Sequence, residues 1–203
     1  MDYRLFTGED AVGWWSCGRA LQERMEIRSI PARFCDRVYV AAPGTPWGEM
    51  ARDVMRTLTM DTAPIIGIVG DRGTGKTQMC AYITYRAIRA RVSSRYTTAS
   101  DLLRNVREAM GFSGPSEREA IKRYTDPRVL MIDELQVRAD SQFEDRTLTE
   151  IIDIRYGAMQ PTVLLSNLSK SDFMNSLGPS IVSRMEERGG VMTCDWEGFR
   201  AAS

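Results

Sequence analysis

The residues with the clearest chemical meaning are 70–77, which read Gly-Asp-Arg-Gly-Thr-Gly-Lys-Thr. They follow an apolar run, Ile65 to Val69, that predicts a buried strand, and they precede a stretch from Gln78 to Val92 that predicts a helix. A strand, a GxxxxGK[ST] loop and a helix in this order are typical of a site that binds phosphate. From average residue usage, the four-position pattern arises by chance in roughly one chain in a hundred of this length.

Each position of this loop has a physical role in holding a nucleoside triphosphate. The glycines let backbone N–H groups approach phosphate oxygens, and the helix that follows directs the positive end of its dipole at the same anion. Lys76 can reach the β- and γ-phosphates, and the Thr77 hydroxyl can join the shell of a Mg²⁺ ion. A glycine-rich turn beside an unrelated lysine is the alternative. The predicted nucleotide-binding residues are Gly70, Asp71, Arg72, Gly73, Thr74, Gly75, Lys76, Thr77 and Gln78.

A second motif places two carboxylates after a buried strand. Residues 129–132 are apolar, and Asp133 and Glu134 follow them directly. Such a strand, buried in a parallel sheet, delivers its acids at the carboxyl end, where sites in α/β proteins lie. Asp133 would hold Mg²⁺ together with Thr77, and Glu134 would polarise a water for attack on the γ-phosphate. The motif is weak alone, but with the phosphate loop in the same chain it favours hydrolysis over transfer to a second substrate.

A third apolar strand, Thr162 to Ser166, ends at Asn167. An amide at this strand end could orient the attacking water or contact the γ-phosphate, or it could simply cap the next turn. Strand–helix units with parallel connections imply a sheet that helices cover on both faces. Farther along, a last helix carries Arg184, and Arg200 follows a final strand, Val191 to Trp196.

The composition limits the kinds of protein that this chain can be. The 203 residues, 43% hydrophobic and 27% charged, fit one domain with a real core. Lys+Arg and Asp+Glu both number 27, which excludes a strongly basic nucleic-acid-binding protein but not a local basic stripe. There is no histidine, which removes histidine catalysis and histidine metal ligands. Four dispersed cysteines predict core residues in a reducing compartment, and with no signal peptide or membrane-length apolar run we expect a soluble, cytoplasmic protein.

Residues 1–45 are predicted to form a short helical segment before the nucleotide-binding domain of residues 46–203, because a turn-rich connector lies between them. Apolar residues at spacings of three and four predict a helix over residues 10–25. Its Trp14 and Trp15 either cover the protein's own core or dock a partner, since tryptophan is favoured at interface centres. Another helix, residues 102–110, is expected to begin at a cap formed by Ser100 or Asp101.

The motifs GDRGTGKT, VLMIDE, PTVLLSN and LGPSIVSRM resemble those of AAA+ ATPases of the DnaC/IstB type, the bacterial and phage helicase loaders and transposition helper ATPases. The resemblance covers most of the chain. It implies an ASCE-type P-loop NTPase fold, an α/β three-layer sandwich with a central parallel β-sheet and little or no C-terminal lid domain. It also implies ATP as the nucleotide, Asn167 as the γ-phosphate sensor, Arg184 as a finger inserted into a neighbouring subunit's site and Arg200 as a second sensor.

The same resemblance implies partners. They are single-stranded DNA, other copies of this chain in an ATP-dependent oligomer, and a replicative DNA helicase contacted through the Trp14/Trp15 segment or the ATPase face. Arg104 and Arg107 share a helix face and are the candidates for DNA contact, with a solvated face as the alternative. One departure is that loaders of this type usually carry a sizeable N-terminal domain, whereas only about 45 residues precede the core here.

The sequence is also compatible with other functions. A transposition helper that acts on duplex DNA with a transposase would share the whole catalytic set. An adaptor in which bound ATP is only structural would share the nucleotide-binding loop. A small-molecule kinase is disfavoured, because nothing between Gly111 and Tyr124 resembles a basic lid.

Overall fold

The computed structural model describes residues 13–16, 19–35, 37–40, 44–59, 62, 64–110, 116–137 and 142–199. Its centre is a five-stranded sheet with strand order β4-β5-β6-β3-β7, and every neighbouring pair in it is parallel. The strands are β3 (Ile65–Gly70), β4 (Ser94–Thr98), β5 (Val129–Asp133), β6 (Thr162–Ser166) and β7 (Gly189–Cys194). Because all five strands run in one direction, their carboxyl ends meet at a single edge of the sheet.

The order of the strands decides which of these ends are neighbours. Strand β6 pairs with β3 on one side and with β5 on the other. The strand that leads to Asn167 therefore lies between the strand before the phosphate loop and the strand that ends at Asp133. On the other side of β3, the register pairs Gly70 with Cys194 of β7.

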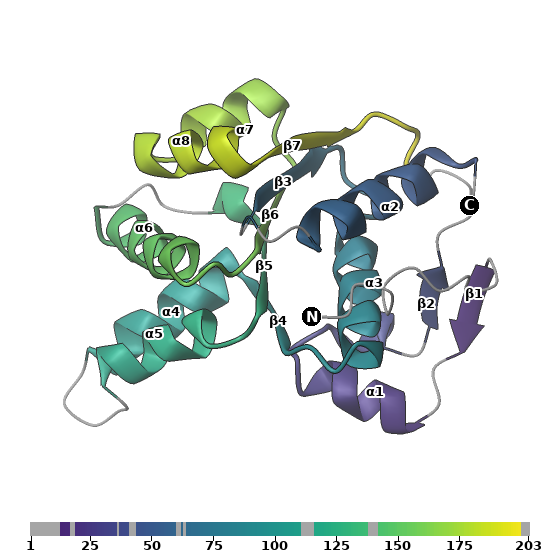
Figure 1. The fold of residues 1–203 in the computed structure, drawn as a ribbon, viewed down its shortest axis with the longest axis horizontal. Helices are drawn as coiled ribbons and strands as arrows, with labels where there is room; N and C mark the ends of the chain where they lie inside the picture. Colours follow the sequence, from purple (N-terminus) through teal and green to yellow (C-terminus); the bar gives the residue numbers. More distant parts are fainter. Residues whose placement is uncertain are drawn as a thin grey trace.

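Helices cover both faces of the sheet, as Figure 1 shows. The helices on one face are α1 (Arg19–Glu26), α2 (Pro46–Leu58) and α3 (Lys76–Arg89). Those on the other are α4 (Ala99–Ala109), α5 (Glu117–Thr125), α6 (Gln142–Gly157), α7 (Lys170–Ser176) and α8 (Pro179–Arg188). Alternate residues of β3 enter the two cores, with Ile66 and Ile68 on the α3 side and Ile65 and Val69 on the other. The predicted three-layer α/β sandwich is confirmed.

The N-terminal region corrects one prediction. Within the described residues, the helix expected over residues 10–25 is present only as α1, because Gly13–Ser16 form strand β1, which pairs antiparallel with β2 (Arg37–Val40). Aromatic residues favour strands, and Gly13 disfavours a helix. The side chains of Trp14 and Trp15 lie outside the part of the structure that is described, so both roles considered for them stay predictions. The domain boundary near residue 45 also stays a prediction.

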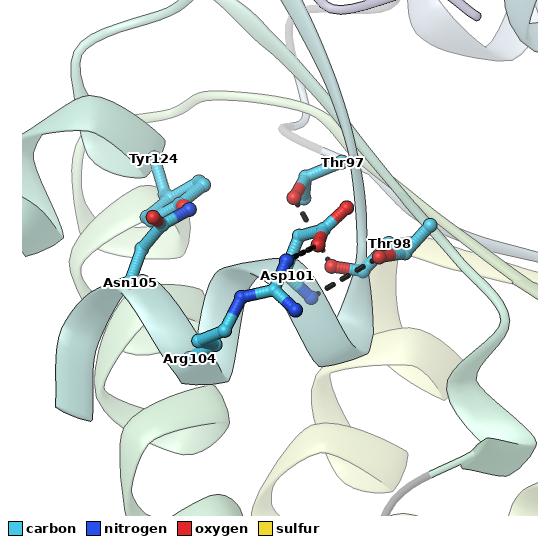
Figure 2. Close-up of polar contacts among 6 residues, drawn as sticks. All are labelled: Thr97, Thr98, Asp101, Arg104, Asn105 and Tyr124. Atoms are coloured by element: carbon cyan, nitrogen blue, oxygen red, sulfur yellow. Dashed lines mark hydrogen bonds and ion pairs between the residues drawn. The ribbon is translucent and has the colours of Figure 1, made fainter. Parts of the chain in front are cut away.

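The start of helix α4 and the burial of the cysteines bear on two further predictions. Helix α4 begins directly at the end of β4, where the Thr98 hydroxyl accepts a hydrogen bond from the Asp101 backbone N–H at 3.1 Å, so the expected cap at Ser100 or Asp101 is wrong (Figure 2). A threonine at a strand end can serve both elements because its backbone is still extended. The described cysteines are buried, as expected of core residues: Cys35, Cys80 and Cys194. None of the helices in the described part of the chain has the length and apolar character that spanning a bilayer requires.

A completely buried arginine, Arg155 on α6, fixes the ends of the sheet that lie opposite the carboxyl edge. Its guanidinium donates hydrogen bonds to the carbonyls of Tyr124, Pro127, Arg128 and Pro161, to Thr162 Oγ1 and to Gln160 Oε1. These acceptors lie at the end of α5 and at the entrances of β5 and β6. Burial, with a smaller effect of Arg128, lowers the pKa of Arg155 to about 9. The arginine thus satisfies the carbonyls that the chain exposes as it enters the two central strands.

We expect Arg155→Met to lower the free energy of unfolding by about 3 kcal/mol or more, because it leaves several buried carbonyls without donors. Urea unfolding followed by circular dichroism measures the effect. Arg146→Met, at an exposed position of the same helix, is the matched control and should change stability by no more than about 0.5 kcal/mol. Equal losses in the two variants would contradict the role assigned to Arg155.

Candidate nucleotide-binding site

The loop of residues 70–77 connects β3 to α3. Gly73 and Gly75 both have φ angles of 90°, in the left-handed region that glycine enters without steric cost. A side chain at Gly75 would also collide with its surroundings, since a Cβ there would lie 2.8 Å from Trp47 Nε1. The glycine at position 75 is therefore required by backbone conformation and by space together.

Lys76, the lysine of the loop, folds back over it. Its Nζ donates hydrogen bonds to the carbonyl oxygens of Gly70 and Asp71, each at 2.7 Å. Burial lowers the pKa of the Lys76 ammonium, although Cys194, Asp133 and Asp71 act in the opposite direction. The loop thus holds a buried amine beside the N-terminus of α3, and both groups attract an anion. The predicted contact with the β- and γ-phosphates remains a prediction.

The outer face of the loop is hydrogen-bonded by residues that the sequence analysis did not identify. Three consecutive carbonyls accept hydrogen bonds: Gly73 O from Phe199 N at 3.0 Å, Thr74 O from Trp196 Nε1 at 3.1 Å, and Gly75 O from Trp47 Nε1 at 3.3 Å. In a planar trans peptide the N–H of the next residue points opposite to the carbonyl. The N–H groups of residues 74–76 therefore point away from these donors, toward the inner side of the loop.

Asp133 and Thr77, the residues predicted to hold Mg²⁺, are in contact. Thr77 Oγ1 donates a hydrogen bond to Asp133 Oδ2 at 2.8 Å. Tyr96 of β4 donates its hydroxyl to the same oxygen at 3.0 Å, and Glu134 N donates to Asp133 Oδ1 at 2.8 Å. A carboxylate and a hydroxyl are the oxygen ligands that Mg²⁺ takes, so the pair fits the ion. Burial, and after it the nearby Asp133, raises the pKa of Tyr96, which keeps its hydroxyl protonated and able to donate.

Glu134 has an unusual backbone. Its φ angle is 59°, in the left-handed region that residues other than glycine seldom adopt, and such a conformation costs about 1–3 kcal/mol. The chain turns there from β5 into a short 3₁₀ helix, Leu135–Val137. The side chain of Glu134 is exposed beside the buried Asp133. A carboxylate in this position can reach water, as a general base must, and that role stays a prediction.

Gln136 links the acidic strand to the strand end that carries Asn167. Its Oε1 accepts hydrogen bonds from Ser166 Oγ at 3.1 Å and from Asn167 N at 3.2 Å. The cap of the following helix α7 is Ser169, so the fold does not need the Asn167 side chain as a cap. Asn167 is half-buried at the same sheet edge as Asp133. This position agrees with the predicted sensor role and does not test it.

The predicted arginine finger, Arg184, lies on α8 and has partners within its own subunit. One of its nitrogens lies 2.6 Å from an oxygen of Asp153, and the guanidinium lies 5.3 Å from the centre of the Tyr156 ring. Its side chain is 24% exposed. A role across a subunit boundary stays a prediction, and Arg200 lies outside the described residues.

The two arginines predicted to contact DNA do share an exposed face of α4. The side chain of Arg104 is 62% exposed and pairs with Asp101, as Figure 2 shows. Arg107 is 61% exposed, lies 3.8 Å from a carboxylate oxygen of Glu144 and covers the Phe143 ring. Each positive charge therefore has a carboxylate beside it, and contact of these arginines with DNA stays a prediction.

We expect Tyr96→Phe to weaken the apparent affinity for Mg²⁺ about tenfold, because partners that orient a metal ligand typically contribute that much. A Mg²⁺ titration of ATP turnover measures the change. Tyr85→Phe on α3, whose hydroxyl accepts from exposed Arg89, is the matched control. Equal Mg²⁺ titrations of the wild type and of Tyr96→Phe would show that Thr77 and the backbone suffice to hold Asp133.

Comparisons with known sequences identify the relatives of this chain. The family model of IstB-like ATP-binding proteins matches residues 46–186. The replicative helicase loader DnaC of Escherichia coli strain K12 is 26% identical over 133 residues, which cover 65% of this chain and 54% of that protein. DnaC of Buchnera aphidicola subsp. Schizaphis graminum is 29% identical over 133 residues, with 64% and 54% covered. The chain thus spans about half the length of these curated relatives.

Solved structures show the same fold. A crystal structure of the DnaC helicase loader aligns with a TM-score of 0.63 and 19% identity, covering 75% of this chain and 92% of that one. The replication initiator DnaA bound to AMPPCP and single-stranded DNA aligns with a TM-score of 0.65 and 18% identity, covering 78% and 49%. These likenesses show the fold, a parallel sheet between two layers of helices. Because the family model covers more than half of the sequence, the chain belongs to the family of IstB-like ATP-binding proteins.

Proposed function

We propose that this protein is a cytoplasmic, ATP-hydrolysing helicase loader that helps to place a replicative helicase on single-stranded DNA. The observation that carries hydrolysis is the contact of Thr77 with Asp133, because it joins the phosphate loop to the acidic strand and sets Glu134 beside the pair. Support for the loader role comes from the curated relatives, which are named replicative helicase loaders.

In the proposed mechanism, the backbone N–H groups of the loop and the Lys76 amine bind the triphosphate. Thr77 and Asp133 would hold Mg²⁺, which would offset negative charge on the phosphate oxygens. Asn167 orients the attacking water against the γ-phosphate, and Glu134 accepts a proton from that water. The bond between the γ-phosphorus and the bridging oxygen breaks, and ADP leaves. Tyr96 and Gln136 fix the directions of Asp133 and of the Asn167 backbone.

The proposed assembly couples this site to DNA. Arg184 of one subunit completes the site of its neighbour, so that hydrolysis requires an oligomer. Arg104 and Arg107 on α4 contact the phosphates of single-stranded DNA, and hydrolysis switches the assembly from a state that holds DNA to one that releases it. The helicase docks through the Trp14/Trp15 segment or through the ATPase face.

A second candidate is a transposition helper that acts on duplex DNA with a transposase. The match to the IstB-like family model favours it specifically, and it uses the same catalytic residues. The kind of DNA that stimulates ATP turnover separates the two candidates.

The deciding experiment measures ATP turnover and sedimentation without DNA, with single-stranded DNA and with duplex DNA. The loader proposal expects assembly and stimulation by single strands. Preference for duplex DNA would favour the transposition helper, and indifference to both would contradict DNA contact by α4.

A double variant tests DNA contact by α4. In Arg104→Gln, Arg107→Gln, the slope of log affinity for single-stranded DNA against log salt concentration should decrease in magnitude by about 0.7 for each lost phosphate contact. The double variant Arg118→Gln, Arg123→Gln on exposed positions of α5 is the control.

A mixing experiment tests the finger. Lys76→Ala removes nucleotide binding and Arg184→Ala removes the finger, so each variant alone should turn over ATP at least tenfold more slowly than the wild type. A mixture of the two should regain part of the activity, because an intact Arg184 of one subunit can serve an intact loop of another. Arg188→Ala is the control, since Arg188 lies on the same helix and covers the same Tyr156 ring. A mixture no more active than its components, under conditions of full assembly, would exclude a finger in trans.

A further inference from the structure

The chain segment after β7, residues 195–199, runs along the outer wall of the phosphate loop. Its path follows from the register that pairs Gly70 with Cys194, because a chain leaving β7 must continue beside the loop that leaves β3. Trp196 Nε1 donates to Thr74 O at 3.1 Å, and Phe199 N donates to Gly73 O at 3.0 Å. The approach is so close that a Cβ at Gly198 would lie 3.2 Å from Arg72 O.

The ring of Phe199 ends this segment at the start of α3. Its Cε2 lies 3.1 Å from the position that a Cβ on Gly75 would occupy, and the residue is 63% exposed. Trp47, which approaches the same glycine, is buried at 2% exposure and bonded to the loop carbonyl. Phe199 therefore presents an open aromatic surface directly beside the phosphate-binding loop, where leaving a phenyl ring in water forgoes burial free energy.

The ring lies beside the loop that would hold the phosphates of a nucleotide, against Gly75 at the start of α3. The phosphates would bind at the inner N–H groups of the loop and at the N-terminus of α3. We propose that Phe199 forms the contact surface for the nucleobase, and that Trp196 is the positioning residue that fixes the segment bearing it. The proposal rests on nucleotide binding by the Gly70–Thr77 loop and adds the element that contacts the base.

The test compares two probes that share the phosphates but not the base. Equilibrium affinities of the full chain for ATP and for inorganic tripolyphosphate are measured by competition against a fluorescent ATP analogue. Phe199→Ala should weaken ATP binding about tenfold, within the range measured for loss of a base–aromatic stack, and leave tripolyphosphate binding unchanged. Phe199→Tyr should restore ATP binding. Trp196→Phe, which keeps an aromatic ring but removes the donor to Thr74 O, should weaken ATP binding more than tripolyphosphate binding.

Other outcomes separate the alternatives. Equal losses for ATP and tripolyphosphate in Phe199→Ala would mean that the segment only shapes the phosphate loop, and no loss for either would mean that Phe199 does not contact the base. Loss of assembly at unchanged affinity would assign the ring to a subunit contact. Each of these results overturns the proposal. Thermal unfolding of each variant checks the fold. If Phe199→Ala is unstable, Phe199→Leu is measured in its place. Lys76→Ala should weaken the binding of both probes, and it therefore tests the phosphate site itself. If the protein is not a helicase loader, all these expected affinities are unaffected.

Discussion

The buried carboxylate of Asp133 is the group on which the arrangement of the site depends. A charged group at 5% exposure is stable only when hydrogen-bond donors surround it, and here they come from three places. Tyr96 reaches it from β4, Thr77 from α3, and Glu134 from the chain that follows β5. Satisfying one carboxylate therefore requires β4, β5 and the phosphate loop to be in register at one edge of the sheet.

The phosphate loop shows a second constraint of the same kind. Glycines give the loop its path, but a glycine chain is conformationally free and loses more entropy on ordering than other residues do. The indole groups of Trp47 and Trp196 and a backbone N–H hold three successive carbonyls from outside. The supports come from α2 and from the segment after β7, so two segments that are far apart in the sequence converge on the loop. A loop held in this way has its N–H groups in place before a ligand arrives, which lowers the cost of binding.

Arginines in this protein illustrate how environment decides the role of one residue type. Arg155 is buried, and its donors are used by carbonyls and side-chain oxygens at the strand entrances. Arg104 and Arg107 are exposed and have carboxylates beside them, so they can exchange partners at little cost. Arg184 is intermediate, with an ion pair to Asp153 and a stacked tyrosine ring. For Arg184 to act on a neighbouring subunit, the new contacts must offset the loss of these two.

Local sequence determined the elements of the site and left their support undetermined. The loop of residues 70–77, the acids after β5 and Asn167 after β6 each depend on a few adjacent residues, and the parallel sheet follows from alternating strands and helices. Two local predictions failed because a neighbouring signal was stronger: strand-favouring aromatic residues replaced a helix at residues 13–16, and Thr98 capped α4. The roles of Tyr96, Gln136, Trp47 and Trp196 come from contacts between residues far apart in the chain. Spacing in the sequence carries no signal for such contacts, because only the packed sheet brings their strands and helices to the same edge.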